Sequence, residues 1–273
     1  MRYLIALLLA LPLFADPDWE AAMKSVRDEM GDGVRVEHVG LFVVATDADD
    51  RTYQRAKGSL TGCADALLKT YFDTRPTWVL TCYLFKGAET YNAYVKQRSG
   101  HDPTSPYGFY QHDGKCLIMD ISTGTGTLVH EMVHAFAEAD FPSIPSWFNE
   151  GMGSLHEQCD LGADGSLEGL TNWRLPILQK ALAADTAPSW EKLSHLSTEE
   201  FYGEEKGVNY SVARYLCVWL QQQKLLVKFY KEFRAHAADD PTGWATLVKT
   251  LGRPEEECER EWRVWAGKLE WKR

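Results

Sequence analysis

The chain has 273 residues, 45% of them hydrophobic and 25% charged, which is enough to bury one large core or two closely packed lobes. The formal net charge of −10 argues against nucleic acid and against anionic membrane surfaces as partners. Composition therefore favours a globular protein and excludes little else.

The first fifteen residues have the pattern of a secretory signal peptide. Met1-Arg2 is a short basic start, the run from Leu4 to Phe14 is apolar, and the small residue Ala15 suits cleavage. This run is too short to anchor the chain across a bilayer, and no later run reaches the roughly 18 apolar residues that a span needs. We therefore expect a secreted or periplasmic (cell-envelope) protein without membrane insertion after cleavage. An uncleaved N-terminal anchor is the alternative.

Periodicity predicts alternating helices and strands in the N-terminal half. Three segments carry apolar residues at helical spacing: residues 17–31, 53–71 and 88–96. Two apolar runs each predict one buried strand: His38–Ala45 and Trp78–Phe85. A loop rich in Gly and Pro follows at residues 100–106. The runs 108–111 and 115–119 lie on either side of an Asp-Gly dipeptide and so predict a β-hairpin.

The next helix carries the most informative motif of the chain, since residues 130 to 134 read His-Glu-Met-Val-His. Two histidines four residues apart project from one helical face, so His130 and His134 can reach one metal ion. Glu131 lies about a quarter turn round the helix, where it can reach an activated water without taking a coordination position. The pattern is typical of a hydrolytic zinc site.

The flanks of this motif are apolar on nearly every side, so the helix should be buried. Buried imidazoles and carboxylates are costly unless they are paired or bind a metal, which argues against a chance match. Residues 122–127 are expected to supply flexible turns and a hydroxyl cap for the helix. It should end near Asp140, because Pro142 disfavours a helical residue before it.

Glu150 lies sixteen residues after His134 and is the expected third ligand. Three protein ligands leave a fourth position for water, and an open site of this kind is catalytic in design.

After Glu150 the pattern is almost entirely helical, with five breaks: residues 162–165, 188, 203–207, 239–243 and 252–254. The expected fold class is therefore α+β, with an α/β half, the helix of the motif and an α-helical C-terminal half. We expect an N-terminal α/β lobe (residues 16–145) and a helical C-terminal lobe (residues 146–273) that together form one catalytic domain, with the metal in the cleft between them.

Six cysteines permit up to three disulfides in an exported chain, and at least one is expected. None lies in a C-x-x-C pair, which gives no support for a zinc ribbon or a thioredoxin-like motif. Cys82 and Cys217 lie in apolar runs and could equally be buried free thiols.

The chain resembles the gluzincin branch of zinc metallopeptidases, and within it the small bacterial peptidase-MA-like domains. The resemblance rests on three blocks and on the order of elements from about residue 34 to the C-terminus. The blocks are Thr127–His134, Pro145–Gly151 and Tyr210–Leu216. It implies a zincin-like fold, in which a compact mixed sheet backs two central helices and a helical half follows.

The resemblance implies Zn²⁺ as cofactor, with His130, His134 and Glu150 as its ligands and Glu131 as general base and acid. Members of this branch often place a tyrosine or histidine where it hydrogen-bonds the tetrahedral intermediate. Tyr210 is the position that matches, with Tyr202 and His195 as rivals, and an ordinary core aromatic is the alternative for Tyr210. His156 and Glu157 are expected to lie outside the metal's direct contacts or at the surface.

Asp140 is the rival third ligand, since it lies six residues after His134, where the metzincin branch has its third ligand. That branch needs a glycine at the position of Ala137, so that the helix can break. Alanine continues the helix, and Asp140 is therefore a poor candidate.

The chain is thus expected to be a secreted zinc-dependent peptidase acting on a peptide or protein substrate, which could pair with an edge strand such as Lys115–Ile118. One alternative is a catalytically inactive zincin-like domain that serves as an exported binding or structural module, and another is a binding module with a fortuitous motif. Oligomeric state is left open, with a monomer favoured. Cleavage specificity, and endo- versus exopeptidase action, are not indicated.

Overall fold

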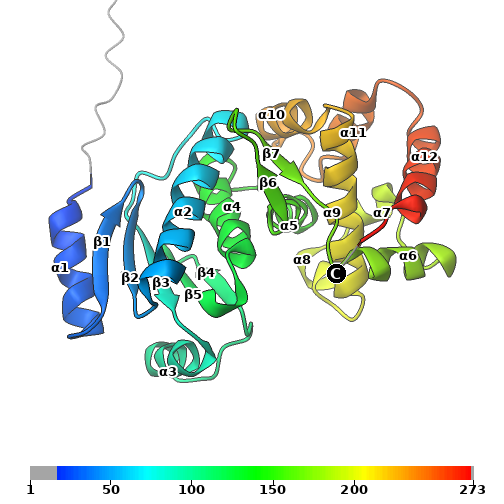
Figure 1. Cartoon of the computed structure of the whole chain (residues 1–273). Helices are drawn as coiled ribbons and strands as arrows, with labels where there is room; N and C mark the ends of the chain where they lie inside the picture. The colour runs from blue at the N-terminus through cyan, green and yellow to red at the C-terminus, as the bar shows by residue number, and fades with distance from the viewer. Residues whose placement is uncertain (1–16, 272–273) are drawn as a thin grey trace, which may run out of the picture.

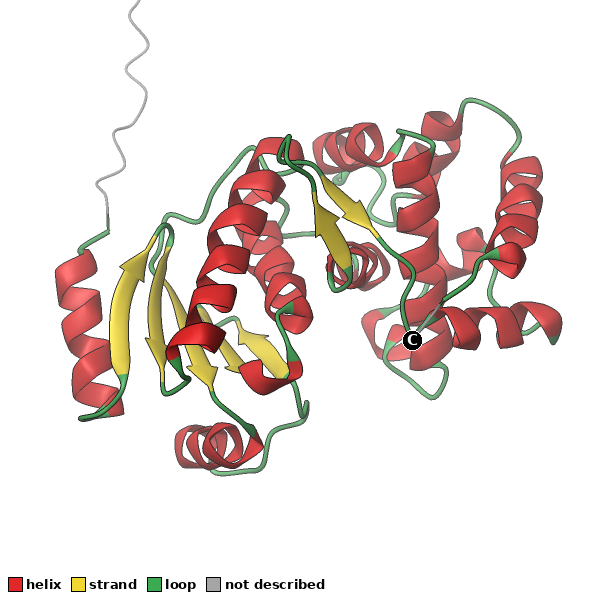
Figure 2. Cartoon of the chain, in the orientation of Figure 1, coloured by secondary structure: helices red, strands yellow, loops and turns green. Residues whose placement is uncertain are grey.

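The computed structural model describes residues 17–271, and the predicted signal peptide (residues 1–15) lies outside the described residues. A five-stranded sheet with its helices forms the N-terminal half, and the C-terminal half is helical (Figures 1 and 2). The expected α+β class is therefore confirmed. No helix in residues 17–271 is long and apolar enough to cross a membrane.

The sheet is mixed and has the strand order β1-β2-β3-β5-β4. Its strands are β1 (Arg35–Val39), β2 (Phe42–Thr46), β3 (Leu80–Phe85), β4 (Gly108–Gln111) and β5 (Cys116–Asp120). The three inner strands run parallel, whereas β1 and β4 are antiparallel edge strands. The inner strands are almost wholly buried because helices cover both faces of the sheet.

Four helices sandwich this sheet: α1 (Trp19–Met30), α2 (Asp50–Thr70), α3 (Ala88–Ser99) and α4 (Gly126–Asp140). Apolar side chains of α1 and α3 pack on one face, together with alternate residues of the strands. The other face packs on α2 and α4, and that core continues into the C-terminal helices. The predicted helices of this half are confirmed.

The segment His38–Ala45 is not the single strand that its apolar run predicts. It forms parts of two antiparallel strands, and the chain reverses between Val39 and Phe42. Gly40 adopts a φ of +58° in this turn, which glycine reaches without strain. A run that is apolar throughout gives no periodic signal of such a break.

The predicted β-hairpin is confirmed, but its outer strand is β4 rather than β5. β5 pairs with β3 on one side and with β4 on the other. The segment Lys115–Ile118 therefore offers no free edge to a substrate, and that expectation is wrong. The free edge of this hairpin is β4.

The helix α4 starts without the predicted hydroxyl cap. Thr125 is its N-cap residue, but no side-chain hydrogen bond is made there, and a short 3₁₀ turn (Ile121–Thr123) precedes it. At the other end, α4 continues through Ala137 and stops at Asp140, as predicted.

The C-terminal half starts with α5 (Ser146–His156) and a short hairpin of β6 (Cys159–Leu161) and β7 (Leu167–Gly169). Seven helices follow: α6 (Leu175–Ala183), α7 (Trp190–Ser194), α8 (Thr198–Phe201), α9 (Lys206–Gln222), α10 (Leu226–His236), α11 (Trp244–Leu251) and α12 (Glu255–Lys268). The almost wholly buried α9 packs against α5, α6 and α7. The hairpin was not predicted, although the expected break at residues 162–165 lies in its turn.

All six cysteines carry free thiols, so the expected disulfide is not formed in this structure. Cys82 and Cys217 are fully buried, in agreement with the alternative reading of those two positions.

Candidate metal centre

The helices α4 and α5 bring together the three predicted metal ligands, and all three side chains are buried. One ligand atom from each of His130, His134 and Glu150 lies within 4.8 Å of the other two. Glu150 Oε2 is 3.1 Å from His130 Nε2 and 3.7 Å from His134 Nε2. The arrangement is compatible with an HExxH-type site that could hold a metal ion.

Two glycines on different faces of α5 allow this helix to approach α4 and α9 closely. A side chain at Gly153 would place its Cβ 2.9 Å from His130 Nε2, so only glycine leaves room for that imidazole. A Cβ at Gly151 would lie 2.9 Å from Cys217 Sγ and 3.0 Å from the carbonyl oxygen of Ala213, both on α9. The glycines that follow Glu150 thus let α5 pass closely between α4 and α9.

The orientation of the second imidazole is fixed by Asn149, which precedes Glu150. His134 Nδ1 lies 3.0 Å from Asn149 Oδ1. In the tautomer that donates from Nδ1, the lone pair of Nε2 is free for a metal ion. Sequence reasoning did not single out Asn149, although its place beside a ligand was a signal.

The electrostatics of the triad favour a positive charge between its side chains. Burial opposes protonation of His130, but the hydrogen bond to Glu150 and the charges of Glu131 and Glu150 raise its pKa to about 9. Burial likewise opposes ionisation of Glu150, but the two imidazoles lower its pKa to about 2. The carboxylate and an imidazolium therefore stabilise each other, and a bound cation would take the place of that proton.

Glu131 lies beside the triad and outside it. Its side chain is partly buried, and Oε2 accepts a hydrogen bond of 2.9 Å from the backbone N–H of Tyr110 on β4. Burial raises the pKa of this carboxyl group, against the opposing effect of the two imidazoles. A raised pKa makes a carboxylate a better proton acceptor, as a general base requires.

Two of the three candidates for hydrogen-bonding a reaction intermediate lie at the site. Tyr202 donates from its hydroxyl to Glu150 Oε1 over 2.5 Å, and Tyr210 lines the same cavity with Arg174 stacked 4.7 Å from its ring centroid. His195 is exposed and does not line this cavity; its Nδ1 lies 2.8 Å from the carbonyl oxygen of Glu191.

The cavity at the triad has a volume of about 440 Å³ and a largely polar lining. Residues of the edge strand β4 form one wall, and Glu157 and Arg174 contribute to another. Arg174 donates from Nε to Glu157 Oε2 over 3.1 Å, a pair that sequence reasoning missed.

His156 and Glu157 are both buried, so neither is a surface group. Glu157 pairs with Arg174 in the wall of the cavity. His156 lies with Nδ1 2.8 Å from the carbonyl oxygen of Met152, and its Nε2 has no hydrogen-bond partner among residues 17–271.

Asp140, the rival ligand, belongs to a different cluster at the end of α4. Its carboxylate accepts hydrogen bonds from the backbone N–H of Thr74 (2.6 Å) and the hydroxyl of Tyr230 (2.8 Å), and it pairs with Arg234. These partners occupy its oxygens and hold it away from the triad.

No family profile matches the chain, and a search of curated proteins also finds no match. The chemistry of the site therefore has to be inferred from its own donor set: two imidazole nitrogens, one carboxylate and a neighbouring second carboxylate.

Proposed function

We propose that the chain is an exported zinc-dependent peptidase of the gluzincin type. The observation that carries this proposal is the position of Glu131, beside the ligand triad yet outside it, at a cavity open to a substrate. A purely structural metal site has no use for that second carboxylate. Two imidazoles and one carboxylate suit Zn²⁺, which in catalytic sites keeps one position open. When bound, this ion supplies Lewis-acid activation of water and of the scissile carbonyl.

Residues of the chain supply proton transfer, stabilisation of the transition state and substrate binding. Glu131 accepts the proton of the attacking water on its carboxylate and later delivers it to the leaving amine. A hydroxyl from Tyr202 or Tyr210 donates to the oxygen that becomes negative in the transition state. The outer edge of β4 (Gly108–Gln111) pairs with the main chain of an extended peptide, which supplies affinity without demanding particular side chains.

Replacement of the proposed base tests the mechanism directly. Glu131→Gln should retain about one zinc per chain but lose hydrolysis of an unfolded, fluorescently labelled protein by roughly 10²–10⁴-fold, the usual effect of acid–base groups. Glu256→Gln is the control for the same chemical change, because Glu256 is exposed on α12 and does not line the cavity. It should retain activity.

Undiminished turnover in Glu131→Gln would refute the assigned base. If the wild-type protein binds zinc but hydrolyses no peptide substrate, the alternative holds, namely an inactive zincin-like domain that serves as an exported binding or structural module.

A further inference from the structure

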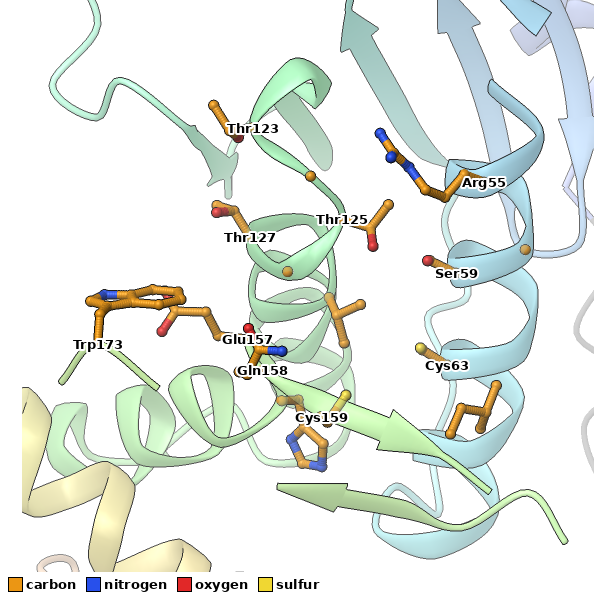
Figure 3. Close-up of a pocket in the computed structure, with 16 residues that line it drawn as sticks. Arg55, Ser59, Cys63, Thr123, Thr125, Thr127, Glu157, Gln158, Cys159 and Trp173 are labelled. Carbon is orange, nitrogen blue, oxygen red and sulfur yellow. The ribbon is translucent and has the colours of Figure 1, made fainter. Parts of the chain in front are cut away.

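A second cavity, of about 530 Å³, lies between α2, the start of α4 and the segment that follows α5 (Figure 3). Thr127 and Glu157 line both this cavity and the one at the triad, so the two share a wall. Two cysteines border the second cavity from different parts of the chain. Cys63 comes from α2 and Cys159 from β6.

The approach of the two cysteines depends on a glycine. A side chain at Gly62 would place its Cβ 2.7 Å from Leu161 Cδ2, so glycine lets the β6–β7 hairpin pack closely onto α2. Side chains alternate along a strand, and Cys159 therefore shares a face with Leu161. Cys63 directly follows Gly62, and Figure 3 shows the sulfurs of Cys63 and Cys159 turned toward each other at the cavity that both residues line.

We propose that Cys63 and Cys159 are a disulfide-forming pair, oxidised by a small-molecule disulfide or by a thiol–disulfide oxidoreductase. The thiolate of Cys63 attacks one sulfur of the oxidant and expels a thiolate. Cys159 then attacks the sulfur of Cys63 in the mixed disulfide and expels the second thiolate. Both cysteine protons end on the two released thiols, and the oxidant takes up the two electrons. This inference does not depend on peptidase activity.

The chemistry of the six thiols favours this pair. The interaction between the two thiols lowers the pKa of Cys63 and raises the pKa of Cys159, so Cys63 is the thiol of the pair that attacks first. Burial raises the pKa of the other four: Cys82, Cys116, Cys217 and Cys258. Cys63, although buried, and the half-buried Cys159 line this cavity, whereas the other four thiols do not.

The bond would close a loop of 96 residues, the difference between positions 159 and 63. It would tie α2 to the strand that follows the ligand-bearing α5, at the wall shared with the cavity of the triad. Long loops give the largest loss of entropy in the unfolded chain, so oxidation should raise the Tm by roughly 5–15 °C.

The test compares the purified protein after full reduction and after incubation with oxidised glutathione. Alkylation in denaturant followed by mass spectrometry should count six free thiols in the reduced protein and four in the oxidised protein, with the Cys63 and Cys159 peptides cross-linked. Either Cys63→Ser or Cys159→Ser should abolish both the cross-link and the rise in Tm. Cys258→Ala, which removes a buried thiol elsewhere, should keep both.

Six alkylated thiols after oxidation, a cross-link between other cysteines, or a glutathione adduct on Cys63 that Cys159 does not displace would each overturn the proposal. The mass map of the wild-type protein gives this answer even if a variant fails to fold. Hydrolysis measured on the same two samples separates the test of the peptidase from the test of the disulfide. Inactivity in both samples counts against the peptidase and leaves the disulfide result unchanged.

Discussion

Glu150 has partners at both of its carboxylate oxygens. Oε1 accepts the hydroxyl of Tyr202, and Oε2 faces His130 and His134. Asn149 orients His134 in the same way. Partners of this kind fix the ligand geometry and so reduce the cost of ordering the ligands on metal binding.

Glu150→Gln should therefore weaken zinc binding by at least about 100-fold, because it removes one of three ligands. Zinc content after dialysis and a competition titration with a chelator measure the effect. The matched control is Asp140→Asn, which should keep zinc but lose about 2–4 kcal/mol of stability, because Asp140 pairs with Arg234 in a buried cluster. If Asp140→Asn loses zinc and Glu150→Gln keeps it, the third ligand is Asp140 and not Glu150.

His156 is a buried base that should make stability depend on pH. Burial, with a smaller contribution from the charge of Arg214, lowers its pKa from about 6.5 to about 4, although the hydrogen bond to Met152 opposes this. Between these two values the unfolded chain binds a proton that the folded chain does not. The stability that neutral His156 contributes to the folded protein is therefore fully present above pH 6.5. It is lost as the pH falls to about 4, and the total loss is about 3 kcal/mol.

His156→Gln keeps a donor for Met152 and cannot titrate in this range. Urea unfolding at pH 7 and at pH 4.5 should show a smaller loss of stability in this variant than in wild type, by about 2–3 kcal/mol. His101→Gln, at an exposed position, controls for the removal of one histidine. Equal losses in wild type and His156→Gln would contradict the assignment.

At the scale of elements, the metal centre depends on how closely α5 approaches α4. The contact between Gly153 and the ring of His130 sets that approach, since a Cβ would lie 2.9 Å from Nε2. Either the helix or the imidazole must shift to admit a side chain.

Gly153→Ala should consequently lower zinc affinity by about 10-fold or more, the size of effect seen when groups around a ligand are disturbed. The far-UV circular dichroism spectrum should stay unchanged. Gly267→Ala in α12 is the control, because nothing lies within 4 Å of its added Cβ. That substitution should leave zinc binding intact and raise stability by up to about 1 kcal/mol. Unaltered zinc affinity in Gly153→Ala would show that the contact does not constrain His130.

Elements differ in how far their sequences reveal them. The sequence predicts α4 with its end near Asp140, because Ala137 does not interrupt the helix and Pro142 disfavours a helical residue before it. The hairpin of β6 and β7 was missed, since strands of three residues are too short to show alternation. The edge position of β4 also has no local signal, because the order of strands in a sheet is set by long-range pairing.

For the whole molecule, the site joins the two halves of the fold. Its ligands come from α4, which packs on the sheet, and from α5, which packs on the helical half through α9. A bound ion therefore requires the native packing of both halves and should stabilise the folded state alone.

Zinc at about 100 times its dissociation constant should raise the Tm by about 5–10 °C, since this excess corresponds to about 2.7 kcal/mol. Differential scanning calorimetry with and without EDTA measures the shift. Glu150→Gln should show little shift at the same zinc concentration. A similar rise in wild type and in that variant would mean that zinc stabilises the protein somewhere other than the triad.

The sequence by itself determined what depends on local spacing. Histidines four apart on a buried helix had to share a face, Ala137 let that helix continue as far as Asp140, and apolar periodicity distinguished the half that alternates helices and strands from the helical half. Tertiary structure alone decided that Tyr202 bonds Glu150, that His195 lies outside the cavity, that β4 rather than β5 is an edge strand, and that Cys159 and Cys63 line one cavity. The physical reason is that periodicity fixes the side of its own element on which a residue lies, whereas a partner far along the chain is chosen by how whole elements pack.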